Sequence, residues 1–131
     1  MILAVCVDDS LGLSFGGRRQ SKDAALRRRL LAQSGGRLRM SDYSARQFES
    51  DVYSGADYLS SAEKGDWCFA ENTEYELYSE KIEQIVLFRW NRSYPADVFF
   101  RFPDTWTAVR SEDFPGTSHE TITMEVYKKC E

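Results

Sequence analysis

The sequence predicts one α/β domain with a mixed, mostly parallel sheet flanked by helices. Short apolar segments typical of buried strands are separated by helical segments, and two strand-like segments close the chain. The length of 131 residues is enough for one hydrophobic core. No repeat or linker interrupts the pattern, so residues 1–131 are expected to form a single domain.

The strand candidates are short apolar segments rich in β-branched and aromatic residues. Residues 2–8 and 81–90 are the clearest, and the first of them is typical of a central strand. Residues 121–127 instead alternate between polar and apolar types, as a half-buried strand does. The expected strands are residues 2–8, 37–40, 66–70, 81–90, 97–102, 106–111 and 120–128. Helical turns are expected at 41–48 and 56–64, and a loop at 12–17.

The longest helix is predicted over residues 21–33. Ser21 is a suitable N-cap, Asp23 falls in the first turn, and Gly35-Gly36 ends the segment. Three leucines form one apolar stripe, and Asp23 projects onto the same face. A carboxylate one turn above an apolar stripe is the most informative local feature of the chain.

Composition limits the expected cellular compartment and the kinds of metal or disulfide site. No apolar run approaches the roughly 20 residues that a membrane span needs, and the first residues lack the features of a signal peptide. The cytoplasm is therefore the expected compartment, with no membrane partner. Cys6, Cys68 and Cys130 form no CxxC pair and are expected to be free thiols. A single histidine excludes a hydrolase built on several metal-binding histidines, so no metal site is expected.

Charge is distributed unevenly along the chain. Residues 1–39 carry eight basic and three acidic side chains, whereas residues 40–131 carry nine basic and eighteen acidic ones. The basic segment 18–39 either forms a face for an acidic protein or nucleic acid, or is simply a solvated surface. Nucleic-acid binding is not expected, because no aromatic residue is interleaved with these cations.

The order of motifs resembles the dihydrofolate reductase family over most of the chain. The first strand with Gly12 behind it, the helix, and the closing segments all fit that pattern. The closing segments are IVLFRW at 85–90, ADVFF at 96–100, WTAV at 106–109, SEDF at 111–114 and the final strand at 121–128. The resemblance implies a minimal reductase-like fold in which Asp23 is the pocket carboxylate that binds a pterin. It also implies that residues 40–48 form the turn that contacts the cofactor's phosphates.

The sequence departs from the family mainly at the NADPH site. Residues 18–20 (RRQ) replace the family's Pro-Trp, and residues 41–43 (SDY) replace its Gly-Arg turn. Asp42 would repel phosphates that an arginine attracts. Glu71-Asn72 stands near a lost Gly-Gly pair, so backbone cannot approach a pyrophosphate closely. The scaffold is therefore expected to be kept and the NADPH site lost, leaving the cofactor unknown.

The candidate ligand-binding residues surround the helix start and the strand ends. Asp23 either offsets the helix dipole, contributing about 0.3–1 kcal/mol, or pairs with a cationic or amide-bearing ligand. Arg18 and Arg19 either lie in a solvated loop or bind a carboxylate or phosphate. The candidates are Asp8, Arg18, Arg19, Gln20, Asp23, Asp42, Tyr43, Glu71, Asn72 and His119.

No catalytic residue is assigned from the sequence. A Ser118-His119-Glu120 triad is disfavoured, because adjacent residues of a strand point to opposite faces. The leading hypothesis is a degenerate reductase-like domain that binds a small ligand without NADPH-dependent turnover. The alternatives are an interaction module that uses the basic 18–39 face and a divergent NADPH-dependent reductase. The oligomeric state is left open.

Overall fold

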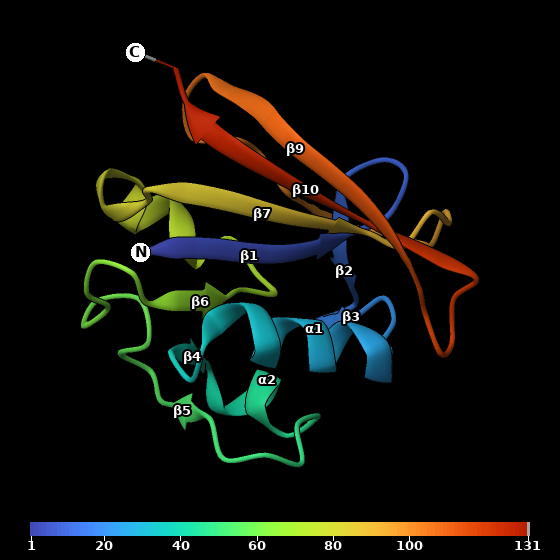
Figure 1. Ribbon diagram of the computed structural model, residues 1–131, viewed down its shortest axis with the longest axis horizontal. Coiled ribbons are helices and arrows are strands. Elements are labelled where there is room, and N and C mark those ends of the chain that lie inside the picture. The colour runs from blue at the N-terminus through green and yellow to red at the C-terminus, as the bar shows by residue number, and fades with distance from the viewer. Residues whose placement is uncertain (131) are drawn as a thin grey trace.

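The computed structural model describes residues 1–130 and contains a seven-stranded, mostly parallel sheet (Figure 1). Five neighbouring strands run parallel, and the last two pair antiparallel at one edge. The mixed α/β class expected from the sequence is thus confirmed. In spatial order the strands are β5 (Tyr53–Ser54), β4 (Leu38–Met40), β6 (Trp67–Phe69), β1 (Ile2–Val7), β7 (Gln84–Arg89), β10 (Thr121–Lys129) and β9 (Trp106–Pro115).

Strand β1 lies near the middle of the sheet because its side chains are apolar on both faces. Ile2 is level with Trp67 of β6 and with Gln84 of β7. Leu3, Val5 and Val7 pack into one hydrophobic core, and Ala4 packs into another on the opposite face. A strand covered on both faces needs such a continuous apolar run.

Helices are fewer than the sequence suggests. Helix α1 (Ala24–Ser34) covers one face of the sheet through Leu26 and Leu30, which are fully buried. Its N-cap is Asp23 and not Ser21, so the N-cap lies two residues later than expected. The other helical elements are α2 (Asp42–Ala45) and a 3-10 helix, η1 (Glu74–Lys81). Residues 56–61 form turns where a helix was expected.

A small second sheet lies beside the end of β1. It contains β3 (Arg18–Arg19), β2 (Gly12–Phe15) and β8 (Val98–Phe99). Gly16 and Gly17 connect the first two strands with φ of 59° and 76°, the backbone that a two-residue hairpin turn requires. Residues 12–17, expected as a loop, are therefore mostly a hairpin.

Helix length and the state of the cysteines are two further features of the structure. None of the helices within residues 1–130 is both long and apolar enough to cross a bilayer. The three cysteines are free. Burial raises the pKa of the Cys68 thiol to about 11, which makes it an unreactive core residue.

Candidate functional site

Polar residues gather beyond the carboxyl ends of the parallel strands. Asp8 follows β1, residues 41–44 follow β4, and Glu71 follows β6. In Figure 1 this edge lies toward β3 and the start of α1. Ligands of open α/β sheets bind at this edge, because the loops there diverge and leave a crevice.

Arg19 and Glu71 form a partly buried ion pair at this edge. Arg19 Nε donates to Glu71 Oε2 at 2.8 Å, and its Nη2 donates to Oε1 at 3.0 Å. The guanidinium also lies over the ring of Tyr43, 4.5 Å from its centroid. Burial tends to lower the pKa of Arg19, but Glu71 raises it above its usual value. The three side chains therefore form one fixed wall.

Glu71 is held from a second direction by residues of α2 and its C-terminal end. The Ser44 hydroxyl donates to Glu71 Oε1 at 2.7 Å, and the Gln47 amide donates to the same oxygen at 3.4 Å. Neither residue was predicted from the sequence. The carboxylate is thus committed to contacts within the protein.

Two hollows adjoin this wall and share Arg18, Arg19 and Tyr43. The larger has a volume of about 570 Å³ and is also lined by Ser21 and Lys22. The smaller, about 390 Å³, extends past Ser44 and Glu71 toward the second sheet. The structure therefore brings together Arg18, Arg19, Tyr43, Glu71 and Asn72 of the predicted site.

Asp8 and Gln20 lie on the inner side of the same edge. The buried Asp8 carboxylate accepts main-chain N–H groups of Ser10 and Gly12, at 2.9 and 2.7 Å, and of Tyr94, at 3.1 Å. Burial opposes its ionisation, but these hydrogen bonds hold the pKa of Asp8 below its usual value. Gln20 donates to Asp8 at 3.3 Å, and its Oε1 is buried without a partner among residues 1–130.

Asp23 is a buried junction between α1 and the loop before β10. Its Oδ1 accepts N–H groups of Ala25, Leu26 and Thr117 and the Thr117 hydroxyl, at 2.8–3.3 Å. Its Oδ2 accepts N–H groups of Ser118 and His119 and the His119 ring. The side chain lines neither hollow. Although burial opposes it, these bonds hold the pKa of Asp23 well below its usual value.

His119 continues the junction toward the larger hollow. Its Nδ1 lies 3.0 Å from Asp23 Oδ2. Its Nε2 lies 3.0 Å from Ser21 Oγ and 2.9 Å from Tyr94 Oη. The imidazole is buried and stacks on Trp90 with ring centroids 4.4 Å apart. The ring is therefore oriented on both edges and on one face.

The sequence did not reveal the partners of His119. Ser21 and Tyr94 are 98 and 25 residues away in the chain, so no local spacing signals either contact.

Two other predicted site residues, Asp42 and Asn72, do not contact His119 or Asp23. Asp42 is exposed in the first turn of α2, and Asn72 accepts the N–H of Glu74 at 2.9 Å.

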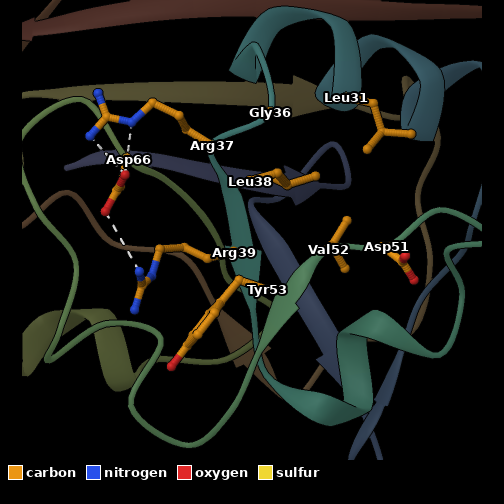
Figure 2. A pocket seen from close by; sticks show the side chains of 9 residues that line it. All are labelled: Leu31, Gly36, Arg37, Leu38, Arg39, Asp51, Val52, Tyr53 and Asp66. Atoms are coloured by element: carbon orange, nitrogen blue, oxygen red, sulfur yellow. Dashed lines mark hydrogen bonds and ion pairs between the residues drawn. The ribbon is translucent and has the colours of Figure 1, made fainter.

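A separate cavity of about 240 Å³ lies between α1 and strands β4 and β5. Arg37 and Arg39 turn toward Asp66, with N···O distances of 2.8 and 3.6 Å, whereas Leu31 and Val52 lie away from this ion cluster (Figure 2). Because its cations are paired, this cavity offers a ligand less free charge than the hollow at Arg18.

No set of three or more metal-ligating side chains converges within residues 1–130. A scan against protein-family models finds no match, and a search of curated proteins finds no similar sequence. The geometry of the site therefore carries the functional argument.

Proposed function

We propose that this protein binds a small anionic ligand in the hollow lined by Arg18 and Lys22. The observation that carries the proposal is a difference in charge pairing. Arg19 is neutralised by Glu71, whereas Arg18 and Lys22 form no ion pair with any of residues 1–130. Two unpaired cations at the rim of one hollow favour a carboxylate or phosphate.

The domain is proposed to be a degenerate reductase-like fold without NADPH-dependent turnover. A mostly parallel sheet closed by an antiparallel strand pair supports this proposal. The residues at the strand ends do not fit the phosphates of NADPH. Glu71 places a carboxylate where the resemblance implies glycines, and Asp42 adds a second acid beside the α2 turn. Asp42 repels phosphate oxygens, and Glu71, whose carboxylate is held by Arg19, leaves neither glycine backbone nor a free cation at this position to bind them.

The alternative of a basic docking face receives less support. Of the eight cations in residues 18–39, four pair with acids of the same chain: Arg19 with Glu71, Arg29 with Glu112, and Arg37 and Arg39 with Asp66. Such pairing lowers the net positive potential that would attract an acidic partner.

Thermal unfolding with added ligands tests the proposal. Phosphate, succinate, dihydrofolate, NADPH, NADH and common nucleotides are added separately. A ligand that binds only the native state stabilises it by about 2.7 kcal/mol at 100 times its Kd. At least one anion is expected to raise the unfolding midpoint. The rise caused by NADPH should be no larger than its phosphate groups alone would cause.

Matched variants locate the binding site. The Arg18→Ala/Lys22→Ala double variant should lose the anion-induced shift. Arg28 is also exposed and forms no ion pair with residues 1–130, so Arg28→Ala is the matched control and should keep the shift. If no anion shifts the midpoint, or if the double variant shifts like the wild type, the proposal is wrong. A shift that needs the intact NADPH molecule would instead support a reductase.

A further inference from the structure

We propose that Ser21 is a nucleophile, activated by His119 and Asp23, that hydrolyses small carboxylic esters carrying an anionic group. The three side chains form a continuous hydrogen-bonded series that ends in the larger hollow. This proposal uses the anion site of the proposed function to hold the substrate, but the nucleophile is a separate claim. The series differs from the adjacent Ser118-His119-Glu120 set, whose residues are consecutive in the chain.

The Asp23 end of the series sets the tautomer of His119. An ionised carboxylate only accepts hydrogen bonds, so Nδ1, 3.0 Å from Asp23 Oδ2, carries the proton. Nε2 is then the acceptor that faces Ser21 Oγ at 3.0 Å. The Trp90 stack fixes the ring plane. Nucleophile, base and orienting acid are thus each within hydrogen-bond reach of the next, as serine activation requires.

Two hydroxyls compete for Nε2, and only one of them lines a hollow. Tyr94 Oη lies 2.9 Å from Nε2 but lines neither hollow, whereas Ser21 lines the larger one. A neutral imidazole offers one lone pair at this nitrogen, so it accepts from one hydroxyl at a time. Tyr94 therefore holds the ring when Ser21 has given up its proton or is turned to the substrate.

The chemistry balances with water as the only co-reactant. Ser21 Oγ attacks the ester carbonyl carbon while its proton passes to His119 Nε2. The carbon–oxygen bond to the alcohol then breaks, and the alcohol leaves with that proton. Water, losing a proton to Nε2, attacks the acyl-serine, which releases the acid and returns the proton to Ser21 Oγ. Asp23 stabilises the charged imidazolium in both halves of the cycle.

The substrate class follows from the charges beside Ser21. Lys22 is the next residue in the chain, and Arg18 lines the same hollow. Their unpaired cations suit a carboxylate or phosphate on the acyl part of the ester. A hollow of about 570 Å³ accommodates a small ester but is too small for an ester with a long acyl chain.

Covalent labelling tests the nucleophile directly. A fluorophosphonate probe should add to the intact protein as Ser21 Oγ displaces fluoride, and peptide mass spectrometry should place the adduct on Ser21. Ser21→Ala should abolish the label. Ser118→Ala, which removes an exposed hydroxyl beside His119, should keep it. No adduct, or an adduct unchanged in Ser21→Ala, overturns the proposal.

Ester hydrolysis tests the substrate class. The wild type should cleave 4-nitrophenyl hydrogen succinate in preference to neutral 4-nitrophenyl butyrate, and Ser21→Ala should lower the rate by at least about 100-fold. Tyr94→Phe removes a hydroxyl that only orients the His119 ring and should lower the rate far less than Ser21→Ala does. Equal loss in Tyr94→Phe and Ser21→Ala would make the network structural only and overturn the proposal.

The two proposals fail separately. An anion-induced rise in the unfolding midpoint with neither label nor hydrolysis would refute the nucleophile and leave anion binding standing. Labelling and hydrolysis of the neutral ester without any anion effect would keep the nucleophile and refute the anion site.

Discussion

Replacing Asp23 with alanine should cost about 4 kcal/mol of stability. The change removes an N-cap, at about 1 kcal/mol. It also leaves the part-buried N–H of Ser118, the buried N–H of His119 and the buried His119 ring without an acceptor, at about 1–3 kcal/mol for each of the two His119 donors, which water reaches least. In a domain of this size the unfolding midpoint should fall by about 12–16 °C.

Denaturant and thermal unfolding, followed by circular dichroism, measure this loss. Asp9→Ala is the matched control, because that exposed carboxylate accepts only the Ser93 hydroxyl; it should change stability by less than about 0.5 kcal/mol. Asp23→Asn keeps the cap and should lose about half as much as Asp23→Ala. A loss below about 1 kcal/mol in Asp23→Ala would refute the argument that this carboxylate stabilises the junction.

The low pKa of Asp23 gives this stabilisation a defined pH dependence. A carboxylate whose pKa is lower in the folded than in the unfolded protein stabilises fully above the unfolded pKa of about 4. Its contribution is lost as the pH falls through the lower, folded value. The gap between wild type and Asp23→Asn should therefore persist to about pH 5 and narrow below pH 4. A gap that is unchanged at pH 3 would contradict the ionised state.

Three further changes test the packing of the same region. Gly116→Ala should lower stability by about 1–3 kcal/mol in urea unfolding, because its Cβ would lie 2.5 Å from the His119 carbonyl oxygen; a neutral effect would contradict that close approach. Leu30→Ala should cost about 2–5 kcal/mol, since Leu30 is fully buried under the sheet. Ellman's reagent should react with Cys130 in the native protein but with Cys68 only after unfolding. Labelling of Cys68 in native buffer, located by peptide mass spectrometry, would contradict this burial.

The strands were predictable because their signal is local. The apolar run at residues 2–8 and the alternation at 121–127 each report burial within one segment, and strands form there at Ile2–Val7 and Thr121–Lys129. The hairpin at 12–19 was missed because its two strands are only four and two residues long. Its Gly16-Gly17 turn was the available signal.

The candidate site was only partly predictable because its contacts are distant in sequence. Arg19, Tyr43 and Glu71 were each singled out, but their mutual contacts depend on the ends of three different elements. Asp23 was singled out either as an acid that offsets the helix dipole or as a carboxylate that pairs with a ligand. Its contacts with residues 117–119, which occupy both oxygens, span 94 to 96 positions and have no local signal. Either residue type suits the N-cap position, so the sequence did not distinguish Ser21 from Asp23, whose carboxylate accepts the N–H groups of Ala25 and Leu26.

The central position of β1 has a consequence for synthesis of the chain. Its first residue is level with Trp67 and Gln84, so β1 is synthesised before both of its partner strands, which end at residues 69 and 89. Synthesis adds about 5–20 residues per second, so residues 2–7 remain an unpaired apolar segment for roughly 4–16 s before residue 89 is added. The order in which the ribosome delivers the strands thus leaves the nascent chain most prone to aggregation until both neighbours of β1 have been synthesised.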